Sequence, residues 1–133
     1  MRISTLLSAA VLTLGLVSAG IPAASAATEA PYSEAAFKAS QKQGRPILVH
    51  ITATWCPTCA QQHPILSKLE ADPKFKDLMV YDVDFDSQKD VVNAMGARMQ
   101  STLIVFNGST ERGRSTGDTN AGSIRELVEK SGQ

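Results

Sequence analysis

The sequence predicts an α/β fold in which a central mixed sheet of about four strands is flanked by helices. Apolar, β-branched runs typical of buried strands alternate with segments of helical periodicity, which favours right-handed crossovers and parallel pairing. Near the C-terminal end, the pair Asn107-Gly108 separates a buried run from a polar one and predicts a tight hairpin. The hairpin adds antiparallel strands, so the sheet is expected to be mixed.

Length and composition indicate one ordinary globular domain. The chain has 133 residues, of which 43% are hydrophobic and 20% are charged. Lys plus Arg and Asp plus Glu both total 13, so the chain has no charge excess suited to nucleic acid or an anionic membrane. We therefore expect no nucleic-acid partner.

The N-terminal segment indicates export. Arg2 precedes an apolar run at 6–17 that is too short for a membrane span, and small residues at 24–26 fit a signal-peptidase site. We expect a signal peptide at 1–26 that is cleaved, a single domain at 27–133, and a periplasmic or secreted location without stable membrane insertion. An uncleaved membrane anchor is the alternative, whereas a lipid anchor would need a cysteine near the cleavage site.

The elements of the first half follow from local signals. The segment 27–31 is interpreted as a flexible lead, and Ser33 is a suitable N-cap for a helix over 33–43. The almost continuous apolar run at 47–53 is typical of a strand covered on both faces, which places it in the middle of the sheet. A helix over 57–70 follows, with an internal proline expected to bend it.

The second half alternates in the same way, with a strand at 78–85 and a short helix that ends at Gly96. A third strand is expected at 102–106, a polar edge strand at 111–115, and a last amphipathic helix after 117–119.

Two cysteines at the start of the helix over 57–70 carry the chemistry. Pro57 suits the first helical position, so Cys56 falls at the N-cap. There the unpaired backbone N–H groups and the helix dipole favour a thiolate and lower the thiol pKa. Cys59, one turn along, can form a disulfide with Cys56 or attack a mixed disulfide formed there. We therefore predict that Cys56 is the nucleophile and Cys59 the resolving cysteine.

An ordered set of residues resembles the thioredoxin family. The pattern aligns over 45–106 without a gap, and a glycine before the last helix also matches. The matching residues are Trp55-Cys56-Pro57-Thr58-Cys59, Pro64, Thr102-Leu103-Ile104-Val105-Phe106 and Gly117.

The resemblance implies a thioredoxin-like fold and a thiol:disulfide oxidoreductase whose only redox group is its own Cys56–Cys59 disulfide, with no cofactor and no metal. Expected partners are protein or small-molecule thiols and disulfides, together with a membrane protein that delivers electrons. A small domain without an inserted helical or dimerisation domain favours a monomeric reductant or electron carrier. The supporting site residues are expected to be Trp55, Pro57, Thr58, His50, Ser101 and Thr102.

Two positions depart from the family pattern. His50 stands where familiar thioredoxins have a buried aspartate, and it either fills the strand or accepts the proton of Cys59 as a general base. Ser101 stands where the family has a cis-proline. A cis bond before a non-proline residue costs ~2.5–4 kcal/mol, so the Gln100–Ser101 bond is predicted to be trans, with the Ser101 hydroxyl near the sulfurs.

Other interpretations of the same residues remain open. The cysteines could form a static disulfide, or bind zinc or copper together with His63 and His50 as a metal-handling module. An assembly chaperone with vestigial redox function is a third possibility. Covalent haem attachment is excluded because Ala60 stands where that motif needs histidine.

Two further groups of residues have structural interpretations. The alternating carboxylates Asp82, Asp84 and Asp86 are interpreted as a solvated strand end rather than a calcium site. Met95 and Met99 are interpreted as core residues.

Overall fold

The computed structural model describes residues 26–133, so the expected signal peptide lies, apart from its last residue, outside the described chain. Five strands form one sheet in the order β1-β3-β2-β4-β5. β1 pairs with β3, and β3 with β2, in parallel, whereas β2–β4 and β4–β5 are antiparallel. This arrangement confirms the predicted mixed α/β fold. The strands are β1 (Thr28–Pro31), β2 (Pro46–Thr52), β3 (Met79–Asp84), β4 (Thr102–Asn107) and β5 (Thr110–Thr116).

The strand β1 was not predicted from the sequence. The segment 27–31 is not a flexible lead, because it pairs in parallel with the edge of β3. Backbone hydrogen bonds from Thr28 to Leu78 and from Tyr32 to Asp82, 3.0 and 2.9 Å long, fix it at its two ends. Three of its four residues are exposed, so the strand carries no alternating apolar pattern that would have revealed it.

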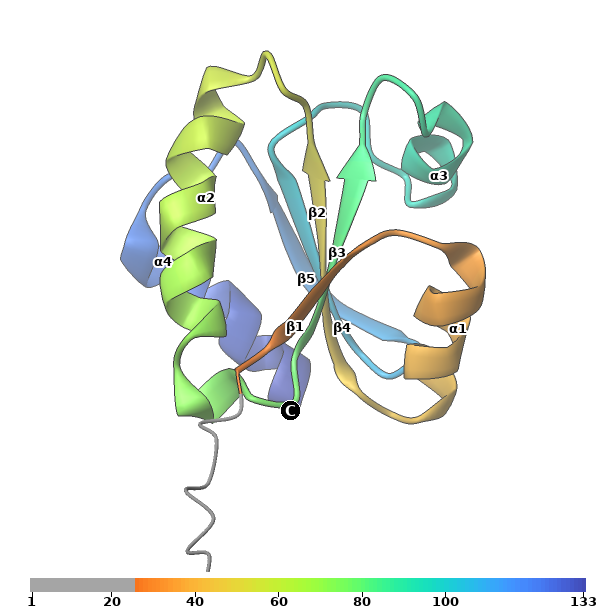
Figure 1. The fold of residues 1–133 in the computed structure, drawn as a ribbon, viewed down its shortest axis with the longest axis vertical. Coiled ribbons are helices and arrows are strands. Elements are labelled where there is room, and N and C mark those ends of the chain that lie inside the picture. The colour runs from red at the N-terminus through yellow and green to blue at the C-terminus, as the bar shows by residue number, and fades with distance from the viewer. Residues whose placement is uncertain (1–25) are drawn as a thin grey trace, which may run out of the picture.

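The helices cover both faces of the sheet. α2 and α4 lie on one side, and α1 and α3 on the other (Figure 1). No helix within residues 26–133 is both long and apolar enough to cross a membrane. Their bounds are α1 (Glu34–Lys42), α2 (Pro57–Glu70), α3 (Lys89–Ala94) and α4 (Ala121–Glu129), with 3-10 turns at Pro73–Phe75 and Lys130–Gly132.

The central strand β2 divides its side chains between the two layers. Ile47, Val49 and Ile51 belong to the apolar cluster that includes residues of α1 and α3. Leu48 packs in the cluster formed with α2 and α4, and strand alternation places His50 on this same face. β2 is therefore buried on both sides, as predicted, and it brings a polar side chain beneath α2.

The predicted hairpin joins β4 to β5 and depends on Gly108. This residue has a φ of 55°, and its N–H donates to the carbonyl of Arg45 at 2.9 Å. A Cβ atom added to Gly108 would lie 3.3 Å from the carbonyl oxygen of Gln41 and 3.3 Å from Cα of Gly44. Both the left-handed backbone and the close approach require glycine here.

We expect Gly108→Ala to lower the free energy of unfolding by about 1–2 kcal/mol, because an L side chain is strained in this conformation. Chemical denaturation of the two proteins would measure the difference. Gly132→Ala is a suitable control, since no heavy atom lies within 4 Å of a Cβ added there. Equal losses in both variants would contradict the assignment of strain to Gly108.

Candidate active site

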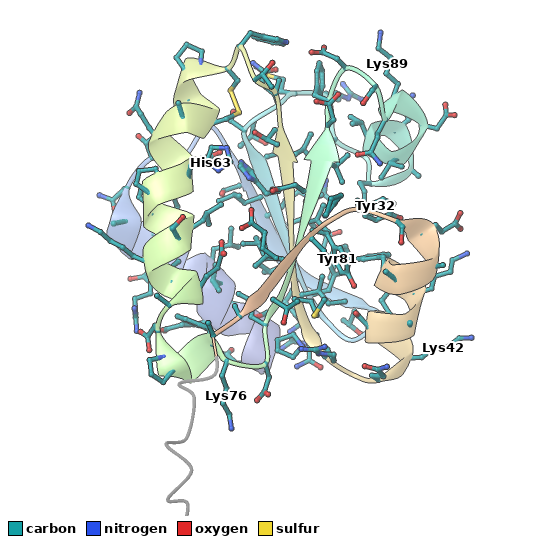
Figure 2. All side chains as sticks on the ribbon, in the orientation of Figure 1. Tyr32, Lys42, His63, Lys76, Tyr81 and Lys89 are labelled. Atoms are coloured by element: carbon teal, nitrogen blue, oxygen red, sulfur yellow. A yellow bond between two sulfur atoms is a disulfide. The ribbon has the colours of Figure 1, made fainter. Side chains whose placement is uncertain are left out.

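The two cysteines form a disulfide at the N-terminal end of α2, visible as the yellow bond in Figure 2. Cys56 is the N-cap, with extended backbone angles, and Pro57 occupies the first turn as predicted. The Cys56 sulfur accepts a hydrogen bond from the backbone N–H of Cys59 at 3.1 Å. A helix N-terminus therefore supplies a donor directed at the sulfur that is expected to become the thiolate.

The disulfide is packed on its inner side and bordered by apolar surface. Cys56 and Cys59 are 3% and 1% exposed and pack with Ala53. Trp55 is 56% exposed and Met99 54%, so the interpretation of Met99 as a core residue is wrong. These are the exposed large apolar side chains of the described chain. Trp55, which precedes Cys56 in the chain, thus offers apolar contact area next to the sulfurs.

The exposed Trp55 ring is held in place by a side chain from the loop after β3. Its indole N–H donates to a carboxylate oxygen of Asp86 at 2.6 Å. Pro57 is exposed and Thr58 half-buried on the neighbouring turn of α2. The predicted supporting residues Trp55, Pro57 and Thr58 therefore surround the disulfide.

His50 lies on the same side of the sheet as α2 and is 1% exposed. Its Nδ1 lies 3.1 Å from Oδ1 of Asp82, and its Nε2 lies 3.2 Å from Oε1 of Gln62. Burial alone would raise the pKa of Asp82, but hydrogen bonds from His50 and Glu29 outweigh it and hold that pKa below its usual value. Asp82 is thus a half-buried partner of His50, a contact that the interpretation as part of a solvated strand end did not include.

The roles of two of these polar residues, Gln62 and Asp82, were not predicted from the sequence. Gln62 is fully buried on α2 and shares the stripe of Cys59, Leu66 and Leu69. A polar residue within an apolar helical stripe was the available signal. Asp82 stands directly opposite His50 in the β2–β3 register, a pairing that the sequence does not specify.

Glu29, on the newly found strand β1, extends the polar group toward the surface. A hydrogen bond with Asp82, together with burial and the nearby Glu70 carboxylate, raises its pKa to about 7. Glu29 and Asp82 line an open pocket of about 490 Å³. The polar group under α2 therefore has an outlet to solvent beside β1.

Ser101 precedes β4 in an unusual conformation. The described chain contains no cis peptide bond, which confirms the predicted trans bond, and Ser101 has a φ of 59°. Its hydroxyl donates to the carbonyl of Gln100 at 2.5 Å, so the hydroxyl is engaged with its own loop rather than with a sulfur. The adjacent Thr102 hydroxyl donates to the carbonyl of Met99 at 2.8 Å. Both side chains thus brace the loop.

The four residues suggested for a metal site do not form one cluster within the described chain, although the two histidine rings lie close together. His63 projects from α2 toward the sheet, and its ring centroid lies 5.2 Å from that of His50 (Figure 2). Within residues 26–133, no group of three or more His, Cys, Asp or Glu side chains is arranged to hold a metal ion. The geometry therefore lends no support to the zinc or copper module.

Comparisons with known proteins agree with the geometry. The family model described as Thioredoxin matches residues 28–130. The crystal structure of Trxlp from Edwardsiella tarda is 40% identical and superposes with a TM-score of 0.73, covering 76% of this chain and 97% of that one. A Malassezia sympodialis thioredoxin, 19% identical with a TM-score of 0.71, covers 81% of this chain and 93% of its own and shows the shared fold.

Curated relatives match over shorter stretches. A thioredoxin from Aspergillus fumigatus is 31% identical over 71 residues, which span 53% of this chain and 64% of that protein. The thiol:disulfide interchange protein DsbE of Pasteurella multocida is 57% identical over 28 residues, or 21% of this chain and 16% of that protein. The chain thus spans less than two thirds of the length of these relatives.

The raised pKa of Glu29 makes stability depend on pH. The carboxyl titrates near 4.5 when unperturbed and near 7 in the folded state, so the folded protein binds the extra proton between these values. Stability therefore falls as the pH rises through this window. Glu29→Gln keeps a donor for Asp82 but does not ionise. We expect it to raise the melting temperature above pH 7 and to change it little below pH 4.5.

Thermal unfolding followed by circular dichroism at several pH values would measure this effect. The exposed Glu126 on α4 provides the matched control Glu126→Gln. A shift of the same size in both variants, or one that does not grow with pH, would contradict the assignment to the Glu29–Asp82 contact.

Proposed function

The chain belongs to the thioredoxin family, and from this premise we propose that it is a thiol:disulfide oxidoreductase that exchanges disulfides with protein or small-molecule thiols through Cys56. The observation that carries the proposal is the disulfide at the start of α2, with the Cys56 sulfur at the N-cap facing a backbone donor. A purely structural disulfide would gain little here, because so short a loop constrains the unfolded chain only weakly.

The exchange transfers two electrons in two steps. In the reducing direction, the Cys56 thiolate attacks one sulfur of a partner disulfide and the other partner sulfur leaves as a thiolate. Cys59, deprotonated, then attacks the Cys56 sulfur, which breaks the mixed disulfide and releases the second partner thiolate. The partner ends as a dithiol and the protein as the Cys56–Cys59 disulfide. The reverse sequence oxidises a partner dithiol.

The surroundings of the disulfide support protein partners. The exposed Trp55, which precedes Cys56 in the chain, offers apolar area beside the sulfurs, as expected of a surface that contacts another chain. The compact domain supports a role as a monomeric reductant or electron carrier, and the resemblance implies a membrane protein as its electron donor. The signal-like segment at 1–26 supports a periplasmic or secreted location.

His50 as the proton acceptor from Cys59 stays a prediction. Its two ring nitrogens already contact Asp82 and Gln62, and the same contacts support a structural role for the ring beneath the site.

Separate roles for the two cysteines can be tested by trapping. We expect Cys59→Ser to accumulate mixed disulfides with partner proteins, because the intermediate at Cys56 then lacks its resolving thiol. Cys56→Ser should accumulate none, since the remaining sulfur lies within α2 rather than at its N-cap. Non-reducing electrophoresis of both variants after incubation with a disulfide-bonded protein would measure the difference.

The double variant lacking both thiols provides the background. Equal trapping by the two single variants would contradict the assignment of Cys56 as nucleophile. Absence of exchange with any disulfide by the wild-type protein would contradict the proposed function.

A further inference from the structure

The buried carboxamide of Gln62 joins three segments beneath the disulfide. It is 0% exposed and lies one turn beyond Cys59 on α2. Its Oε1 contacts Nε2 of His50 at 3.2 Å, and its Nε2 donates to the carbonyls of Ser101 at 3.1 Å and Asp118 at 2.9 Å. One side chain thus connects the central strand, the loop before β4 and the loop after β5.

The orientation of this carboxamide follows from its partners. A backbone carbonyl only accepts hydrogen bonds, so the two hydrogens of the Gln62 amino group point to Ser101 and Asp118. The amide oxygen then faces Nε2 of His50 at 3.2 Å. A flipped amide would place its oxygen against two carbonyl oxygens. The two carbonyls therefore select the orientation in which Gln62 holds both loops and turns its oxygen toward His50.

The Ser101 loop needs such a restraint. A φ of 59° is unfavourable for a non-glycine residue and persists where the surroundings determine it. The Ser101 carbonyl accepts from Gln62 and also from the backbone N–H of Gly117 at 2.9 Å. Proline, whose ring would restrict the backbone, is absent here. The two hydrogen bonds fix the loop instead.

The same loop lies at the disulfide end of the sheet. Thr102, next to Ser101, pairs with Ile51, and β2 ends one residue later. The chain then turns at Ala53, whose carbonyl accepts from the backbone N–H of Cys56 at 3.2 Å. A protein that approaches Cys56 therefore meets this loop, whereas a small thiol needs access to the sulfur alone.

We propose that Gln62, oriented by the two carbonyls that it joins, is a positioning residue that holds the Ser101 and Asp118 loops in the shape that protein partners require for exchange at Cys56. This inference rests on the proposed exchange reaction. It assigns Gln62 an effect on protein disulfides that is separable from the reactivity of the cysteine pair with small molecules.

The first test removes the hydrogen bonds while keeping the length of the side chain. For Gln62→Met, we expect kcat/KM for the reduction of insulin disulfides to fall by roughly tenfold, because the loop then loses hydrogen bonds that hold its shape. The rate of exchange with oxidised glutathione should be unchanged. Thermal unfolding and circular dichroism would establish that the variant is folded.

The second test reverses the polarity of the amide. Gln62→Glu keeps an oxygen for His50 but places a carboxylate oxygen against the two carbonyls, so insulin reduction should fall further at neutral pH. The protonated acid can donate to one carbonyl, and activity should partly recover at lower pH. Gln61→Glu, the same substitution on the exposed face of α2, is the matched control, and the result is the ratio of the two rates at each pH.

The outcomes separate the two proposals. A loss confined to insulin, with recovery of Gln62→Glu at low pH, supports the positioning role. Unchanged insulin reduction in both Gln62 variants, or equal losses with insulin and glutathione, would overturn it. A wild-type protein that reacts with neither substrate would instead overturn the proposed oxidoreductase function.

Discussion

The fixed position of β2 is the constraint on which the site depends. The strand pairs with β3 on one side and β4 on the other, and its apolar side chains are buried in both layers. A one-residue slip in register would turn every side chain of β2 to the other face of the sheet. His50 would then leave the side of α2, and the apolar side chains that face α1 and α3 would face α2 and α4 instead. Because the strand cannot slip, the turn at Ala53 delivers Cys56 to the start of α2 in one geometry.

The polar side chains buried between β2 and α2 are stable there because they form hydrogen bonds with one another and with nearby loops. His50 and Gln62 are almost fully buried, yet each polar atom of their side chains has a partner. A buried amide or imidazole without partners would cost several kilocalories per mole. Asp82, half-buried beside the open pocket, connects this group to Glu29 and to solvent. The interior beneath the disulfide is thus polar but ordered.

Much of this architecture was predictable because its signals are local. The apolar runs identified three strands, the proline after Cys56 identified the helix start, and Asn107-Gly108 identified the hairpin with its polar fourth strand. β1 was not predictable from apolar periodicity, since an exposed edge strand is stabilised by pairing with β3. The partnership of His50 with Asp82 and Gln62 depends on register and helix packing, which no short sequence window contains.

Ser101 shows how one structural requirement can be met in two physical ways. A proline restricts the backbone through its ring, and this restraint is local to the residue. The trans serine instead adopts a left-handed conformation that costs about 1–2 kcal/mol, and hydrogen bonds from Gln62 and Gly117 offset that cost. The restraint consequently comes from other segments of the chain. Since one of these segments is α2 itself, the helix that carries the cysteines also determines the shape of the loop beside them.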